Sequence, residues 1–151
     1  MRNSVKAACM MMIFWVACGT DEGPKPPPDE PIVMNEVDVH GRDWVELVNT
    51  GTSGIIDLSG WTLTDDPGKE SHLYVIPPGT EVGPGERIVI KGEKVKGDGT
   101  GFTFGIKSGE TVRLMAPGGG AQLTVAIKDV PDGFTWGRYP DSTGGWQLTL
   151  P

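Results

Sequence analysis

The sequence predicts an all-β protein, folded as a sandwich or a barrel of short strands. Apolar and polar residues alternate in many runs after residue 31, and a period of two is typical of strands that bury one face. Glycine and proline, which make up 23 and 13 of the 151 residues, separate these runs with turns. No stretch has the period of an amphipathic helix. Eight to ten short runs within one domain's length therefore indicate a sandwich or barrel.

The composition allows one folded domain and argues against nucleic acid as a partner. Hydrophobic residues form 37% of the chain, and its 5 Trp, 4 Phe and 2 Tyr can supply a small core. The net charge is −7, whereas nucleic-acid-binding domains usually carry a basic face. Lys91, Lys94 and Lys96 form the densest basic cluster, but Glu93 interrupts it and Asp98 follows it.

Residues 1–17 have the pattern of a signal peptide. Arg2 and Lys6 give a positive start, and the apolar run that follows is too short to span a bilayer as a helix. The run ends in a small residue before Cys18, which resembles a bacterial lipoprotein signal with a lipidated cysteine. Cys9 and Cys18 are the two cysteines, so we expect a lipid at Cys18 and no disulfide in the exported part. An ordinary secretory signal or an uncleaved anchor is the alternative.

Residues 18–31 predict a spacer that begins at the lipidated cysteine. Residues 19–31, GTDEGPKPPPDEP, contain five prolines and four acids, a composition typical of extended linkers. At about 3.1 Å per residue such a segment would hold the folded domain, residues 32–151, clear of a membrane surface.

The first two expected strands form a hairpin across residues 40–42. Alternation in the first strand places Val33, Asn35, Val37 and Val39 on one face. The second strand, residues 43–49, places one set of side chains on each face: Val45 and Leu47 on the first, and Trp44, Glu46 and Val48 on the second. The remaining expected strands are residues 61–64, 73–76, 87–91, 102–104, 111–115, 123–128, 135–139 and 146–150.

The stretch DLSGWTLTDD, residues 57–66, breaks the alternation. Leu58 and Trp61 both favour a core, yet they lie three residues apart. A β-bulge at Ser59-Gly60 would place both side chains on the same face, because an extra residue in a strand reverses the face of the residues that follow it. Trp61 and Leu63 would then point inward, whereas Thr62 and Thr64 would point out.

Five segments in order carry a family resemblance. They are residues 33–37 (VMNEV), 43–49 (DWVELVN), 57–65 (DLSGWTLTD), 77–80 with 82–86 (PPGT, VGPGE), and 137–141 (GRYPD) with Trp146. Together they resemble the lamin-tail-domain family, an immunoglobulin-like β-sandwich, over nearly all of residues 32–151. The resemblance implies a binding or tethering module without catalysis or a cofactor. The motif residues that it singles out are Asn35, Glu36, Trp44, Glu46, Asn49, Gly60, Trp61, Asp65 and Arg138.

The carboxylates of the first hairpin have a structural and a catalytic interpretation. With an odd register, Glu46 would share a face with Asn35, and Glu36 would share the other face with Asn49. Such pairs could bond backbone groups of a neighbouring sheet. The catalytic alternative is a glycosidase-like acid pair of Glu36 and Glu46.

Two further sites stay open from the sequence. Asp65 and Asp66, with Asp38 or Asp57, could bind calcium, although turn-forming aspartates are common. Residues Trp44 and Val48 could form an exposed apolar patch or belong to the core. No cysteine or histidine pair has zinc spacing.

We therefore expect an exported, lipid-anchored β-sandwich on the outer membrane or cell surface of a bacterium. It would bind or tether a protein or surface polymer without catalysing a reaction. A calcium- or carbohydrate-dependent adhesion module is the competing hypothesis.

Overall fold

The computed structural model describes residues 31–95, 97–119 and 122–151. The predicted signal peptide, Cys18 and nearly all of the predicted spacer lie outside these residues. The described part is all-β, as predicted, with eleven strands and two short 3-10 helices, Glu70–His72 and Pro117–Gly119. Within the same ranges, no helix has the length and apolarity needed to cross a bilayer.

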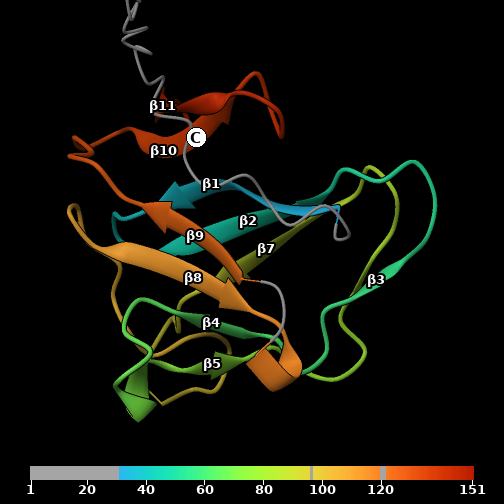
Figure 1. Cartoon of the computed structure of the whole chain (residues 1–151). Coiled ribbons are helices and arrows are strands. Elements are labelled where there is room, and N and C mark those ends of the chain that lie inside the picture. The colour runs from blue at the N-terminus through green and yellow to red at the C-terminus, as the bar shows by residue number, and fades with distance from the viewer. Residues whose placement is uncertain (1–30, 96, 120–121) are drawn as a thin grey trace, which may run out of the picture.

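The larger sheet has five strands in the order β11-β10-β1-β2-β7 (Figure 1). All neighbours are antiparallel, and the predicted hairpin of the first two strands is confirmed. The strands are β1 (Ile32–Asp38), β2 (Trp44–Asn49), β7 (Arg87–Lys91), β10 (Thr135–Tyr139) and β11 (Gly145–Thr149). β10 thus pairs with β1, and β11 pairs with β10, so the C-terminal hairpin extends the sheet on the side away from β7.

The second sheet has four antiparallel strands in the order β5-β4-β8-β9. They are β4 (Thr62–Thr64), β5 (Tyr74–Val75), β8 (Thr111–Met115) and β9 (Gln122–Ala126). A separate two-stranded ribbon pairs β3 (Ile56–Asp57) with β6 (Glu81–Val82), and it extends to one side of the two main sheets (Figure 1). The sequence pattern missed β3 and β6 because two residues are too few to show alternation.

The core lies between the facing sides of the two main sheets. Leu63, Leu114 and Leu123 form a cross-strand row on the smaller sheet, and they face the inner side chains of β1 and β2. The predicted alternation of β9 is confirmed, since Leu123 and Val125 are buried and Thr124 is exposed. The core residues that are no more than 1% exposed are Ile32, Met34, Val37, Val45, Leu47, Leu58, Leu63, Ile76, Val82, Phe102, Ile106, Val112 and Leu114. Each such large side chain contributes about 1.5–3 kcal/mol by burial.

A bulge in β1 corrects the predicted face of that strand. Met34 lies opposite Leu47 and Glu36 lies opposite Glu46, so Asn35 is an extra residue in the ladder. The inner face of β1 therefore carries Met34 and then Val37. The predicted shared face of Val33, Asn35, Val37 and Val39 is wrong for Val33 and Asn35, whereas Val37 and Val39 both contact the core. The extra residue moves every side chain after it to the opposite face of the strand. Counting alternate residues along the sequence does not detect this change, because it does not show where a bulge lies.

The Ser59-Gly60 break is a turn and not the predicted bulge. The Trp61 N–H donates to the Leu58 carbonyl at 3.1 Å, and Gly60 has a positive φ of 76°. The chain changes sheets at this turn, because β3 pairs with β6 whereas β4 pairs with β5 and β8. The expected consequence is nevertheless confirmed, since Leu58 and Trp61 are both buried.

Two smaller expectations also fail. Residues 102–104 form no strand, although Phe102 and Phe104 are buried and Phe102 makes one isolated parallel bridge with Gly92. Thr64 is fully buried instead of pointing to solvent. Its hydroxyl accepts the Asp66 N–H at 3.1 Å, so this polar group is satisfied without water.

The turn predicts a specific loss of stability for Gly60→Ala. A Cβ there would lie 3.5 Å from the Pro117 ring, an ordinary contact, so the cost is that of holding an L-residue at positive φ. We expect about 1–2 kcal/mol of lost unfolding free energy by urea denaturation. Gly145→Ala is the control, because Gly145 has no positive φ and a Cβ there meets nothing within 4 Å. Equal stability of the two variants would contradict the turn geometry.

Candidate functional site

The bulge gathers polar side chains on the outer face of the five-stranded sheet. Asn35 is 2% exposed, and its Nδ2 donates to Glu46 Oε1 at 2.7 Å. Its Oδ1 accepts the Ser142 N–H at 2.6 Å. The Asn35 side chain thus joins β1 to β2 and to the loop between β10 and β11. The predicted shared face of Asn35 and Glu46 is confirmed, and the two side chains also bond each other directly.

Arg138 supports the same bulge from β10. Its Nε donates to the Met34 carbonyl at 3.0 Å, and its Nη1 donates to the Gly144 carbonyl at 3.0 Å. The guanidinium lies 5.0 Å from the centroid of the Trp146 ring, a cation–π distance. Burial lowers the pKa of Arg138. These contacts assign Arg138 a role in holding the carbonyl that the bulge turns away from the ladder.

Glu36 continues this polar row toward the sheet edge. Its carboxylate accepts hydrogen bonds from the hydroxyls of Thr135 and Thr149, the latter at 3.2 Å. On the other side of the row, Arg87 Nη1 lies 3.8 Å from Glu46 Oε1, and Arg87 Nη2 lies 2.8 Å from Asp141 Oδ2. The sequence pattern does not identify these two threonines, Arg87 or Asp141 as partners, because they lie far along the chain from the first hairpin, in β7, β10, β11 and the loop between β10 and β11.

This row, from Arg87 through Glu46, Asn35 and Glu36 to Thr149, crosses all five strands of the sheet. Glu36 and Glu46 lie directly opposite each other in the register of β1 and β2. Each carboxylate is engaged by neighbouring donors, and neither lines the two cavities described below. The arrangement therefore stabilises the sheet, as the structural interpretation of these carboxylates expects.

Asn49 lies on the opposite, inner side, so its predicted shared face with Glu36 is wrong. The bulge at Asn35 is the reason, because it places Glu36 on the outer face. Asn49 is fully buried, and its Nδ2 donates to the carbonyls of Val82, at 2.9 Å, and of Gly54, at 3.2 Å. The predicted type of contact, a side chain bonding the backbone of a neighbouring sheet, is confirmed for Asn49.

The turn after β4 pairs an aspartate with a histidine. Asp65 Oδ1 lies 2.7 Å from His72 Nδ1, and the Asp65 side chain is 5% exposed. The His72 ring stacks on Phe104 at 5.6 Å between centroids. Asp66 Oδ1 accepts the Gly68 N–H at 3.1 Å, which is the contact of a turn-forming aspartate. No group of three His, Cys, Asp or Glu side chains suited to a metal ion occurs within the described ranges.

The apolar residues that the sequence pattern singled out are buried or half-buried in the fold. Val48 is 3% exposed, so it forms no part of an exposed apolar patch, and Trp44 is half-buried. Trp61 is 5% exposed, and it packs in the core cluster as expected.

The comparison with known families agrees with this geometry. The Lamin Tail Domain family profile matches residues 25–129, which is more than half of the chain. This chain belongs to the lamin tail domain family. The match extends over β1 to β9, whereas β10 and β11 follow its end. A search of curated proteins gives no significant match. The family is immunoglobulin-like and non-enzymatic, and the resemblance inferred from the sequence is confirmed.

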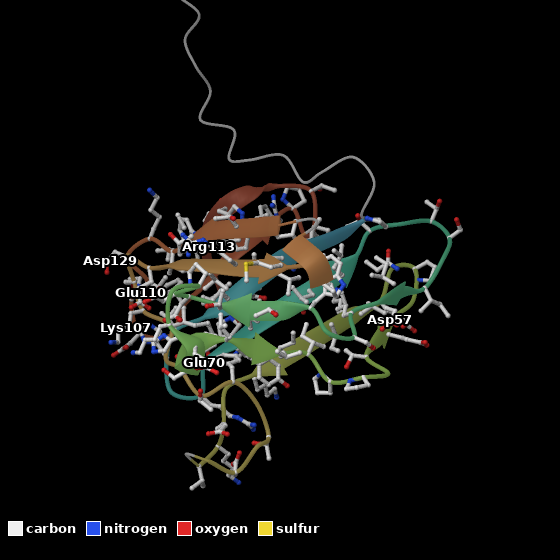
Figure 2. The ribbon with its side chains drawn as sticks, turned by 60° about the horizontal axis from the view of Figure 1, so that its bottom comes forward. Asp57, Glu70, Lys107, Glu110, Arg113 and Asp129 are labelled. Atoms are coloured by element: carbon white, nitrogen blue, oxygen red, sulfur yellow. The ribbon has the colours of Figure 1, made fainter. Side chains whose placement is uncertain are left out.

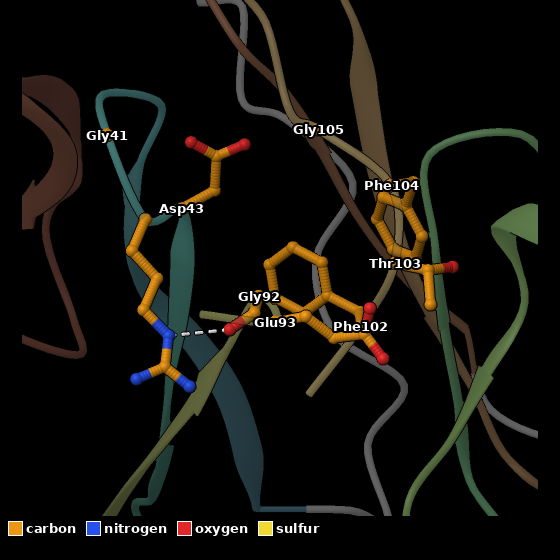
Figure 3. Close-up of a pocket in the computed structure, with 9 residues that line it drawn as sticks. Gly41, Asp43, Gly92, Glu93, Phe102, Thr103, Phe104 and Gly105 are labelled. Carbon is orange, nitrogen blue, oxygen red and sulfur yellow. Dashed lines mark hydrogen bonds between the residues drawn. The ribbon is translucent and has the colours of Figure 1, made fainter. Parts of the chain in front are cut away.

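This lamin tail domain has a cavity of about 220 Å³ beside the β1–β2 turn (Figure 3). Asp43 from that turn lies across from Phe102 (Figure 3). Arg42, from the same turn, also lines the cavity, and its Nε donates to the Gly92 carbonyl at 2.6 Å. Asp43 Oδ2 accepts the Ile106 N–H at 2.6 Å. The carboxylate therefore ties the loop before β8 to the hairpin. No local pattern in the sequence indicates this contact, because it joins residues 63 positions apart.

Burial raises the pKa of Asp43 above its ordinary value. The Ile106 N–H opposes this rise, whereas the charges of Asp38 and Glu110 add to it and that of His40 lowers it. A raised pKa in a cavity is a reason to consider catalysis, but structural contacts produce the same effect. Asp43 holds the Ile106 backbone, and Glu93, the other carboxylate of the cavity wall, accepts the N–H groups of Gly97 and Gly99.

The end of the lamin tail domain that holds the loop before β8 and the loop after β9 carries charges of both signs. Lys107, Glu110, Asp129 and Glu70 lie toward this end, and Asp57 lies at the opposite one (Figure 2). Glu110 accepts the Lys107 N–H at 2.8 Å. These labelled side chains form a mixed surface, without the single sign that a phosphate backbone would require.

The raised pKa predicts how Asp43→Asn changes stability with pH. Because the folded pKa lies above the unfolded one, the stabilising contribution of Asp43 is present below the unfolded value and lost as pH rises through the folded value. An asparagine keeps an acceptor for Ile106 and stays neutral. We therefore expect the stability of D43N relative to wild type to increase from about pH 3 to pH 7 in urea denaturation.

Asp57→Asn is the matched control with the opposite sign. The Ser59 hydroxyl and N–H lower the pKa of Asp57, so its contribution is present at neutral pH and lost as pH falls through the folded value. D57N should be less stable than wild type at pH 7, and the difference should vanish in acid. A parallel trend in both variants would contradict the burial argument for Asp43.

Proposed function

We propose that this chain is a lipid-anchored, exported domain that binds or tethers a protein or surface polymer and catalyses no reaction. One observation carries the non-catalytic part. The carboxylates and the imidazole best placed for chemistry are bound within the fold: Glu36 to Thr135, Glu46 to Asn35, and Asp65 to His72. The lamin tail domain family, to which this chain belongs, is non-enzymatic.

The anchor is supported by the sequence before the domain. A positive start and a short apolar run end at Cys18, and a proline-rich acidic segment follows before β1 begins at Ile32. A diacylglycerol on Cys18 would supply at least two acyl chains, which is what stable membrane attachment requires. The spacer would then present the sandwich away from the lipid surface.

A calcium- or carbohydrate-dependent adhesion role is the second hypothesis from the sequence, and no observation on the described residues favours it. Asp65, its main candidate ligand, is 5% exposed and held by His72. If calcium were a ligand, a calcium titration would raise the melting temperature, because a ligand specific to the folded state stabilises it.

The anchor predicts that Cys18→Ser moves the protein out of the membrane fraction. The full chain is expressed in a bacterial host, and membrane and soluble fractions are separated. Wild type should partition into the membrane, and mass spectrometry should find an N-terminal cysteine that carries a diacylglycerol. C18S should lose both properties. Cys9→Ser is the control, and it should keep them, because Cys9 lies inside the predicted signal. An unmodified cysteine at position 18 in wild type would contradict the anchor.

A further inference from the structure

One side of the sandwich is open between β5 and β7. β7 is the last strand of the larger sheet, and β5 is the last strand of the smaller one on the same side. A groove of about 290 Å³ lies between them. Its apolar lining includes Tyr74, Ile76 and Pro77 from β5 and the residues after it, and Ile88, Val89 and Ile90 from β7.

The groove exposes apolar surface at both of its rims. Val75 on β5 is 58% exposed and Val89 on β7 is 40% exposed, whereas Ile76 and Ile90 below them are 1% and 7% exposed. Tyr74 closes one wall, with its ring edge toward Phe102 at 6.4 Å. An extended segment could therefore cover the rims and reach the partly buried Ile88.

The backbone of β7 leaves hydrogen-bonding groups unpaired along this groove. Glu86 accepts from the Asn49 N–H and Gly92 donates to Asp43, so the even-numbered residues face β2. The Lys91 carbonyl instead accepts from the Phe102 N–H, on the groove side. By alternation, Arg87 and Val89 also direct their N–H and C=O groups to the groove. Within the described residues, these groups have no hydrogen-bond partner.

The chain itself already uses the end of this edge. Gly92 and Phe102 form an isolated parallel bridge, after which the chain leaves the edge. The edge of β7 therefore accepts a strand at Lys91 and leaves the positions of Arg87 and Val89 vacant.

The charge of the groove is positive. Arg42 and Lys91 are its charged lining residues in the described part of the chain, within a protein of net charge −7. The nearby acids point elsewhere: Glu93 accepts the N–H groups of Gly97 and Gly99, and Asp98 accepts that of Thr100, although it remains within electrostatic range of Arg42. Arg42 itself donates to neutral oxygens.

We propose that this groove binds an extended peptide of alternating apolar and acidic residues, which adds as a strand to the edge of β7. This proposal gives a site to the binding role proposed above, and it rests on that role. The apolar side chains would face Ile88 and Tyr74, and the acidic ones would lie on the outer face beside Lys91. Arg87 contributes less, because it already pairs with Asp141 and Glu46. Hydrogen bonds between the two backbones would supply affinity, and the pockets for alternate side chains would supply specificity.

Two other occupants fit less well. A second copy pairing β7 with β7 antiparallel about Val89 would place Arg87 opposite Lys91, and like charges directly opposite destabilise a sheet. The chain's own residues 19–31 are acidic, but their five prolines lack the N–H groups that a ladder needs. A partner segment of alternating apolar and acidic residues avoids the pairing of like charges, and it keeps the N–H groups that the ladder needs.

The test uses the full chain in detergent and a fluorescein-labelled peptide, acetyl-VEVDVEVDV-amide. We expect a saturable rise in anisotropy. A peptide of the same composition with its valines and acids grouped should bind at least about tenfold more weakly, as should one N-methylated at alternate residues, because each loses ladder bonds or facing pairs.

Two variants of the protein locate the site. Val89→Pro removes an N–H that faces the groove and not β2, so it should fold, as circular dichroism would show, and weaken binding by about tenfold or more. Lys91→Glu should also weaken binding, and a peptide with lysines in place of the acids should restore it. Lys128→Glu is the charge-matched control, and it should bind like wild type, because Lys128 is exposed outside the groove.

The outcomes separate this proposal from the anchoring role. Absence of saturable binding, or equal binding of both peptides by wild type and V89P, would overturn the groove as a strand-accepting site. That result would leave the lipid at Cys18 unaffected. If wild type carries no lipid but binds the peptide, and the Lys91 and Val89 variants bind it more weakly, the result would support the groove. It would contradict the anchor at Cys18 and leave the groove proposal standing. A concentration-dependent increase in the mass of wild type but not of V89P, without peptide, would assign the edge to a second copy and overturn the peptide proposal.

Discussion

Met34 and Val37 lie three residues apart in β1, and both are buried in the core. A regular strand would place them on opposite faces, so one extra residue between them is required. Asn35 supplies it, and its own side chain is then bound by Glu46 and Ser142. The packing of β1 against the second sheet and the polar row on the other face both follow from this single change of parity.

The polar row shows how polar side chains that find partners within the fold can stabilise one face of a sheet. A bulge interrupts the ladder, and it leaves a carbonyl at Met34 that needs a donor. Arg138 supplies that donor from β10, while the hydroxyls of Thr135 and Thr149 engage Glu36. Because every member has a partner within the fold, the row fixes the register of the five strands.

The two ends of the larger sheet differ in how they are used. At one end, β11 pairs with β10 and contributes Thr149 to the polar row, and the Arg138 guanidinium lies over the ring of Trp146. At the other end, β7 presents Val89 between two basic residues. Basic residues on an edge commonly prevent uncontrolled pairing with other chains. The same charges would select an acidic strand over a basic one, so protection and selective binding are compatible at this edge.

Much of the fold could be predicted because alternation is a local property of the chain. The runs of β2, β8 and β9, the inward orientation of Trp61 and the lamin-tail resemblance all came from residues close together in sequence. The same local reading failed at Asn35, because no property of one strand shows that its partner skips a residue. A shift of one residue moves every following side chain to the other face.

The sequence by itself determined the all-β class and the identity of most core residues, because hydrophobic burial depends on composition and short-range pattern. Only the tertiary structure decided that Ser59-Gly60 is a turn between sheets, that Glu36 lies opposite Glu46, and that β7 is an open edge. These features depend on which strands become neighbours. Neighbours are chosen by the packing of the whole chain, over separations that no local pattern records.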